Sequence, residues 1–95
     1  AVGTRSVWLG RGAKGKNVTS GEGFDLSSLD LPGKQLDLLK AVKATGKPVV
    51  VVLITGKPLV MTWAKEHADA VVLQFYGGEQ QGNAMADVLL GKVNP

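Results

Sequence analysis

The amino-acid sequence predicts an α/β fold: an open, mainly parallel sheet flanked by helices, forming an αβα sandwich that is incomplete within this chain. Strand-like apolar runs alternate with segments of helical period in the order strand, helix, strand, short helix, strand, helix. Residues 49–54 (VVVVLI) are apolar at every position, as in a parallel strand that is covered on both faces. Ninety-five residues suit one small domain and three strands are few for such a sheet, so we expect residues 1–95 to form a single, partial domain.

The first expected elements are a short strand and a long loop. Residues 6–9 (SVWL) form an apolar run that stops at Gly10, which predicts a buried strand. Residues 10–31 show no sustained period, and five of the 13 glycines of the chain fall between Gly10 and Gly23. Because loops of this length are usually functional or mobile, we expect functional residues in this glycine-rich loop.

A helix is expected to begin at Pro32-Gly33, because proline is well suited to the first turn of a helix. Leu36, Leu39 and Val42 then recur at helical spacing. The segment 45–48 (TGKP) ends the helix with a glycine that suits a left-handed cap and a proline that prevents continuation.

The second half of the chain continues the alternation. A break at 56–58 (GKP) ends the strand at 49–54, and Thr62 is expected to cap a short helix over 63–69. Residues 70–75 (AVVLQF) predict a third strand. A last helix is expected over 79–90, with Gly91 as its C-terminal cap.

Composition narrows the classes of function. The 11 basic and 8 acidic residues give a formal net charge of +3, and the absence of cysteine excludes disulfides, thiolate chemistry and cysteine-ligated metals. No apolar run reaches the roughly 18 residues of a membrane-spanning helix, and residues 1–11 lack the layout of a signal peptide. We expect no membrane contact, no cofactor and no metal site.

The glycine-rich loop contains two partial phosphate-binding motifs. Gly10, Gly12 and Gly15 spell G-x-G-x-x-G after the expected strand, and residues 10–17 match a P-loop except that Asn17 replaces its hydroxyl residue. Both motifs need a helix that begins at the loop, so that its N-terminus faces the phosphate. Residues 18–23 (VTSGEG) show no helical period, so a basic surface loop is the simpler interpretation.

Other polar features carry weaker signals. Four basic residues precede the first acidic residue of the chain: Arg5, Arg11, Lys14 and Lys16. With only Trp8 interleaved, we expect a solvated face and no nucleic-acid partner. His67 lies among charged residues, and a metal site would need further ligands. The glycosylation sequon at 17–19 matters only in a secreted protein.

Glu22 differs from the other charged residues because of its neighbours. It stands between Gly21 and Gly23, which leave room for a ligand to approach, and Phe24 follows two residues later. Loops above a parallel sheet are where α/β proteins place functional groups. From these residues alone, an ordinary solvated glutamate remains the simpler interpretation.

A series of short motifs extends from about Val7 to the C-terminus. They are 21–25 (GEGFD), 28–35 (SLDLPGKQ), 38–39 (LL), 44–50 (ATGKPVV), 56–59 (GKPL), 67–70 (HADA), 76–78 (YGG), 82–91 (GNAMADVLLG) and 93–95 (VNP). In this order and spacing they resemble glycoside hydrolase family 3, whose β-glucosidase-like and β-xylosidase-like members carry a (β/α)₈ barrel followed by an α/β sandwich domain. The chain is similar to the later part of that sandwich domain.

The resemblance implies a role for Glu22. In many members the barrel supplies an aspartate nucleophile, and a loop of the sandwich domain supplies a glutamate acid/base; Glu22, ten positions before Pro32, matches that glutamate. It would protonate the glycosidic oxygen and then deprotonate the attacking water. Phe24 would line the leaving-group site. The implied substrate is a β-linked glucoside or oligosaccharide, cleaved with retention by an exo-acting enzyme.

No residue of this chain matches the nucleophile aspartate. The resemblance therefore implies that the barrel domain of a longer enzyme is a partner and that the isolated chain lacks turnover. A secreted or periplasmic location would suit that enzyme, and unpaired sheet edges would favour association. Two other interpretations stay open: a phosphate- or nucleotide-binding module that uses residues 10–16, and a non-catalytic scaffold or carbohydrate-binding piece.

Overall fold

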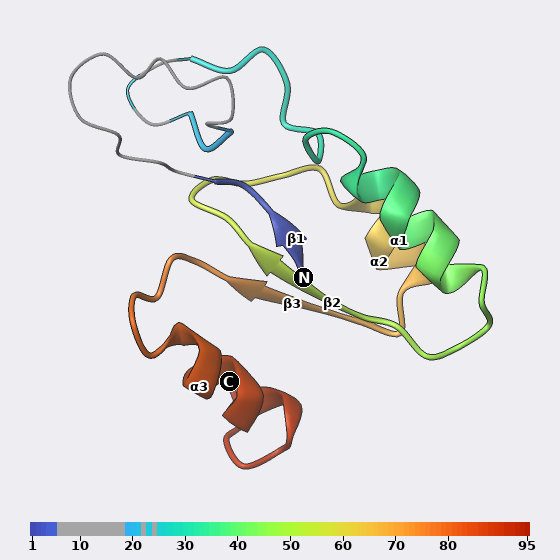
Figure 1. The fold of residues 1–95 in the computed structure, drawn as a ribbon, viewed down its shortest axis with the longest axis vertical. Coiled ribbons are helices and arrows are strands. Elements are labelled where there is room, and N and C mark those ends of the chain that lie inside the picture. The colour runs from blue at the N-terminus through green and yellow to red at the C-terminus, as the bar shows by residue number, and fades with distance from the viewer. Residues whose placement is uncertain (6–18, 22, 24) are drawn as a thin grey trace.

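The computed structural model describes residues 1–5, 19–21, 23 and 25–95, and its elements alternate as predicted (Figure 1). In chain order they are β1 (Val2–Gly3), α1 (Gln35–Lys43), β2 (Val50–Ile54), α2 (Thr62–His67), β3 (Ala70–Gln74) and α3 (Gln81–Leu89). The three strands form one sheet in the order β1-β2-β3, and both pairings are parallel. The predicted fold class, a small and incomplete parallel α/β sandwich, is confirmed.

Register places side chains of neighbouring strands on common faces of the sheet. Val51 pairs with Val71, and Leu53 lies between Val2 on β1 and Leu73 on β3. Because side chains alternate along a strand, these five apolar residues share one face. That face holds the centre of the core, where Val2, Val51 and Leu53 are all buried.

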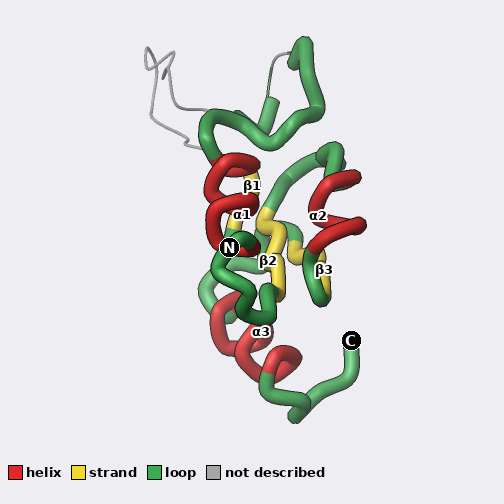
Figure 2. The backbone as a smooth tube through the Cα atoms, turned by 90° about the vertical axis from the view of Figure 1, so that its right-hand side faces the viewer, coloured by secondary structure: helices red, strands yellow, loops and turns green. Residues whose placement is uncertain are grey.

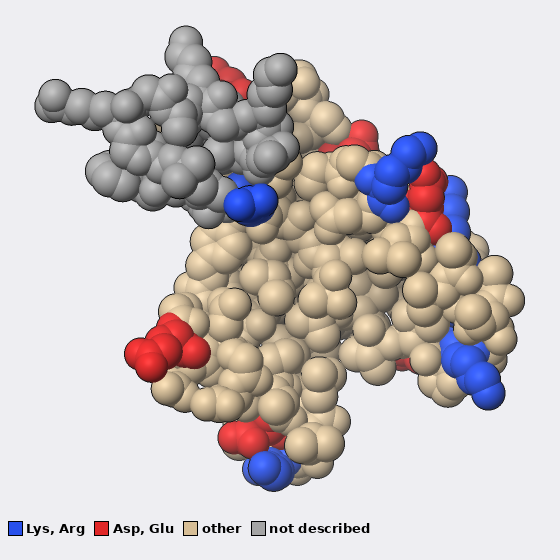
Figure 3. All heavy atoms as spheres, viewed as in Figure 1, with Lys and Arg blue, Asp and Glu red and all other residues tan. Residues whose placement is uncertain are grey.

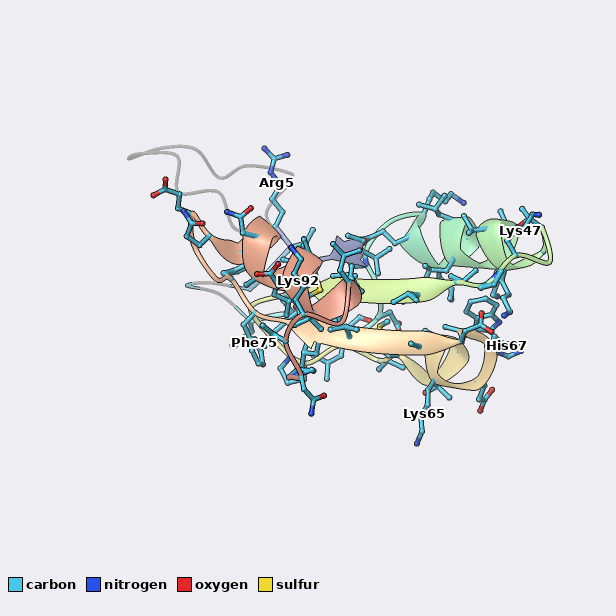
Figure 4. All side chains as sticks on the ribbon, turned by 90° about the horizontal axis from the view of Figure 1, so that it is seen from below. Arg5, Lys47, Lys65, His67, Phe75 and Lys92 are labelled. Atoms are coloured by element: carbon cyan, nitrogen blue, oxygen red, sulfur yellow. The ribbon has the colours of Figure 1, made fainter. Side chains whose placement is uncertain are left out.

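Helices lie on both sides of the sheet. Figures 2 and 4 place α1 and α2 on opposite sides of its plane, with α3 on the side of α1. Leu39 of α1 and Ala64 of α2 are buried in the same core cluster as the β2 residues. The layers therefore follow the αβα arrangement that the apolar run at 49–54 predicts.

The prediction that β2 is covered on both faces is correct only in part. Val51 is 2% exposed, whereas its neighbour Val50, on the opposite face, is 49% exposed. The described part of the chain has only three helices and three strands, too few to cover Val50 as fully as Val51. Leu73 of β3 is 54% exposed, and Phe75, which directly follows this strand, is 60% exposed.

The boundaries of α1 and α2 differ from the prediction for local reasons. α1 begins at Gln35 and not at Pro32, because Gly33 takes a φ of +66°, which lies outside the helical region. Thr62 is the first residue of α2 and makes no capping hydrogen bond; Met61 occupies the cap position. α2 ends at His67 because Ala68 is extended, with ψ of 153°.

Two glycines end their helices as predicted. Gly46 after α1 and Gly91 after α3 take φ of +74° and +71°, values that cost glycine little. At the end of α3 the N–H of Gly91 donates to Val88 (3.1 Å) and that of Lys92 to Asp87 (2.9 Å). These two bonds form a Schellman motif, which satisfies carbonyls that the helix leaves unpaired.

The first strand of the described sheet is one that the sequence analysis did not predict. The strand predicted at residues 6–9 lies outside the described residues, and β1 comes earlier, at Val2–Gly3. Gly3 has φ of +151°, and a Cβ added there would lie 1.7 Å from the carbonyl oxygen of Ile54. Glycine therefore allows β1 to approach β2 closely enough to pair with it.

Asp69 joins the end of α1 to the start of β2. Its carboxylate accepts hydrogen bonds from the Lys43 ammonium (2.8 Å) and the N–H of Val49 (2.7 Å). The Lys43 bond, followed by the Val49 bond, holds the pKa of Asp69 below its usual value. A lowered pKa in the folded state means that the folded protein binds the proton more weakly than the unfolded chain.

We therefore expect acid to weaken the fold through Asp69. The stabilising effect is complete above the pKa of the unfolded chain and is lost as the pH falls through the lower pKa of the folded state. Urea unfolding between about pH 5 and pH 2 should give a smaller loss of unfolding free energy for Asp69→Asn than for the unchanged chain. An identical pH dependence in both proteins would contradict this assignment.

Candidate functional site

The carboxyl ends of the three strands meet at one edge of the sheet, because all pairings are parallel. β1 ends at Gly3, β2 at Ile54 and β3 at Gln74. The long segment between β1 and α1 (residues 4–31) begins at this edge, and its described part 25–31 leads toward α1 (Figure 1). In open α/β sheets this edge is where ligands bind, so the candidate site is built from the residues that follow the strands.

Hydroxyl groups connect the ends of all three strands. Thr4 Oγ1 lies 3.0 Å from Thr55 Oγ1 and 2.8 Å from the hydroxyl of Tyr76, and it also accepts the N–H of Gly56 at 3.2 Å. Thr55 is fully buried, and its hydroxyl donates to the carbonyl of Lys57 at 2.7 Å. This strand-end hydroxyl cluster (Thr4, Thr55 and Tyr76) fixes where the long segment starts.

Arg5, at the beginning of the long segment, is hydrogen-bonded to Thr19 and Ser20, which lie later in the same segment. The N–H of Arg5 donates to Thr19 Oγ1 (2.9 Å), and the carbonyl of Arg5 accepts the N–H groups of Thr19 (2.9 Å) and Ser20 (3.2 Å). Thr19 therefore lies beside Arg5, just after β1, although the two residues are 14 positions apart in sequence. An open cleft runs along this junction and is lined by Thr4, Arg5, Thr19 and Gln35, among others.

The last part of the long segment, around residues 28–30, is hydrogen-bonded to the connection between β2 and α2. The N–H of Val60 donates to the carbonyl of Leu29 at 2.8 Å, and Lys57 Nζ donates to the carbonyl of Ser28 at 3.5 Å. The Ser28 hydroxyl in turn accepts the N–H of Asp30 at 3.0 Å. Hydrogen bonds thus fix the beginning of the long segment to residues that follow β2 and β3, and its last part to the β2–α2 connection.

The predicted site residues Glu22 and Phe24 lie outside the described residues, as do residues 10–16 of the phosphate-binding alternative. The glycines on both sides of position 22 are described. Gly21 and Gly23 have φ of +80° and +77°, which side chains other than glycine rarely adopt. Residues 19–21 are not helical, whereas a phosphate-binding loop needs a helix to begin directly after it.

His67 takes no part in this edge. Its ring stacks on Trp63 with centroids 4.6 Å apart, and Nδ1 lies 2.8 Å from the Trp63 carbonyl oxygen. Figure 4 shows His67 at the opposite end of the sheet from Arg5. Across the described ranges, no three His, Cys, Asp or Glu side chains come together as a potential metal site.

Figure 3 shows the charged residues on one face of the molecule, in the same view as Figure 1. In Figure 3 the Lys, Arg, Asp and Glu residues lie toward the rim, and the middle of the face is formed by other residues. Arg5 is labelled near the carboxyl end of the sheet in Figure 4. Within the part of the chain that the structure describes, no helix is long and apolar enough to cross a membrane.

Sequence reasoning missed the residues that build the edge. Gln35 entered only as one letter of a motif, and the strand-end hydroxyl cluster was not noticed. A usable signal exists for two of its members, since Thr55 directly follows the apolar run at 49–54 and Tyr76 follows that at 70–75. Polar residues in these positions meet at the same edge when the strands are parallel.

Comparisons with known proteins assign the chain to a family. It is 47% identical over 77 residues to a beta-xylosidase of Formosa agariphila, which covers 81% of this chain and 11% of the relative. It is 43% identical to a periplasmic beta-glucosidase of Salmonella typhimurium and 49% identical to a beta-glucosidase of Rhizobium radiobacter; each match covers 78% of this chain and 10% or 9% of the relative, respectively.

The chain thus spans about a tenth of the length of these relatives. No solved structure matches it. The model of the glycosyl hydrolase family 3 C-terminal domain matches residues 5–95, which is nearly the whole chain. This protein chain therefore belongs to the glycosyl hydrolase family 3 C-terminal domain family.

Proposed function

We propose that this chain supplies the general acid/base of a retaining, exo-acting β-glycosidase that hydrolyses O-glycosidic bonds of β-linked glucosides or oligosaccharides. Glu22 is the proposed acid/base, and the nucleophile is an aspartate of a barrel domain outside this chain. The path of the long segment carries the proposal: Thr19, three residues before position 22, is bonded to Arg5 at the carboxyl edge of the sheet. The names of the relatives, β-xylosidase and β-glucosidase, support the reaction class.

The proposed chemistry needs one carboxyl group to act twice. Glu22 first donates its proton to the glycosidic oxygen while the aspartate displaces the leaving group and forms a covalent glycosyl–enzyme intermediate. The Glu22 carboxylate then takes a proton from the water that hydrolyses this intermediate. A retaining enzyme requires about 5–5.5 Å between the two carboxyl groups, so both domains must meet at the substrate.

The remaining assignments follow from this partnership. Residues 1–95 form one partial α/β sandwich domain, and Phe24 lines the leaving-group site. The barrel domain is the principal partner, and a secreted or periplasmic location would suit the longer enzyme. β3 is an outer strand of the described sheet, and its free edge would be covered by neighbouring parts of the longer enzyme or would otherwise favour association.

Glu22→Gln, introduced into the longer enzyme, tests the assignment. Removal of the acid should lower kcat/KM about 10²–10⁴-fold for alkyl β-glycosides, whose leaving groups need protonation. The decrease in kcat/KM, which reports the first step, should be much smaller for 2,4-dinitrophenyl β-glycosides, whose leaving group needs little protonation. Added azide should yield the β-glycosyl azide, because azide attacks the intermediate without a general base.

Two results would contradict the proposal. Hydrolysis that survives unchanged in the Glu22→Gln enzyme would remove Glu22 from the mechanism. Turnover of an aryl β-glucoside by the purified 95-residue chain, used here as the negative control, would show that the chain does not depend on a barrel aspartate.

A further inference from the structure

The side-chain amide of Gln35 makes three hydrogen bonds to the backbone at the sheet edge. Its Oε1 accepts the N–H of Gly3 at 2.6 Å, and its Nε2 donates to the carbonyls of Gly3 (2.8 Å) and Pro32 (3.0 Å). Gln35 is partly buried and is the first residue of α1. An amide that uses its acceptor and its donors on backbone groups in this way has its orientation fixed.

The amide acts on Gly3 as a neighbouring strand would. β1 is an outer strand of the described sheet, with β2 on one side only. On the other side Gln35 pairs with both the N–H and the carbonyl of Gly3, which is the pattern of a residue in a ladder. β1 has only two residues, so these bonds are a large share of what holds it.

The same amide joins the two ends of the long segment. Gly3 precedes residues 4–31 and Pro32 follows them, and both accept a hydrogen bond from Gln35 Nε2. The stem formed by Gly3, Thr4 and Arg5 is thus fixed residue by residue: Gly3 to Gln35, Thr4 to Thr55, and Arg5 to Thr19.

We propose that Gln35 is a positioning residue for the acid/base step of glycoside hydrolysis. The inference rests on the proposed function of Glu22 and deepens it: Gln35 contacts neither substrate nor reacting atoms, but it fixes the segment ends between which position 22 lies. Displacement of a reacting group by about 1 Å can cost on the order of a hundredfold in rate, so a loosened stem weakens proton donation. Reactions that need little protonation are affected less.

Kinetics with two leaving groups, measured in the longer enzyme, separate positioning from a purely structural role. Gln35→Leu keeps much of the volume and removes all three bonds, whereas Gln35→Glu keeps an acceptor for Gly3 and loses the donors. We expect Gln35→Leu to lower kcat/KM about tenfold to a hundredfold for alkyl β-glycosides and by less than about threefold for 2,4-dinitrophenyl β-glycosides. Gln35→Glu should show the same selectivity.

Gln74→Leu is the matched control. Gln74 is also partly buried and also donates to a backbone carbonyl, that of Gln81 at 2.8 Å, but it lies on β3, which β2 separates from β1 and the stem. It should leave the ratio between the two substrates unchanged. Hydrogen exchange at the Gly3 amide should accelerate in Gln35→Leu and not in Gln74→Leu.

The outcomes are distinguishable from those of the Glu22 test. If Glu22→Gln shows the leaving-group dependence and both Gln35 variants lower the two rates equally or not at all, the positioning role is wrong and the proposed function stands. If Glu22→Gln itself shows no such dependence, both proposals are wrong. If Gln35→Leu does not fold, Gln35→Glu decides by the same ratio.

Discussion

Gly3→Ala is expected to prevent β1 from pairing with β2 and to destabilise the chain by about 4 kcal/mol or more, which is exceptional for a single methyl group. The added Cβ would lie 1.7 Å from the carbonyl oxygen and 2.6 Å from the carbonyl carbon of Ile54, both of which are backbone atoms that cannot move aside alone. The φ of +151° adds a conformational cost that alanine cannot avoid. Urea unfolding followed by tryptophan fluorescence measures the loss.

Gly82→Ala is the control for this prediction. A Cβ at Gly82 meets nothing within 4 Å, and the residue lies inside α3, where alanine is favoured over glycine by up to about 1 kcal/mol. We expect this variant to be as stable as the unchanged chain or slightly more stable. If Gly3→Ala unfolded at the same urea concentration as Gly82→Ala, the close approach of β1 and β2 would be wrong.

Val51→Asp is expected to destabilise the chain by several kcal/mol, because Val51 is 2% exposed at the centre of the sheet. It pairs across the strands with the apolar Val71, and it belongs to the same buried core cluster as Leu53 and Ala64. A carboxylate there would either stay ionised without a partner or take up a proton, and both cost free energy. The unfolding free energy in urea at neutral pH measures the effect.

Val50→Asp provides a matched comparison one residue earlier. Val50 has the same side chain on the same strand, but it points to the opposite face and is 49% exposed. The expected loss in this chain is about 1 kcal/mol or less. Equal losses at the two positions would mean that the two faces of β2 do not differ in burial.

The regular elements were predictable because their signals are local. The run at 49–54 predicts β2 within one residue, and the pattern at 79–90 predicts α3 within two. The ends of α1 and α3 were predictable from Gly46 and Gly91, which take the positive φ that glycine favours. Thr62 failed as a cap because residue type alone does not fix which residue leaves the helical region first.

The first strand and the stem were not predictable, because neither leaves a periodic pattern. β1 contains one apolar residue, Val2, and owes its pairing to the missing side chain of Gly3. The contacts of Gln35 and Thr4 connect residues 32 and 51 positions apart, which a single sequence does not reveal. Glu22 was identified through a resemblance in motif order, and it remains a prediction.

The bonds between Arg5 and Thr19 have a consequence for how this family can vary. Arg5 and Thr19 are hydrogen-bonded to each other through side chain and backbone, so the two residues that flank positions 6–18 in the sequence are held together. Doubling the length of a closed loop costs only about 0.6 kcal/mol of chain entropy. We therefore expect changes in the number of residues between Arg5 and Thr19 to alter the stability of the described fold only slightly.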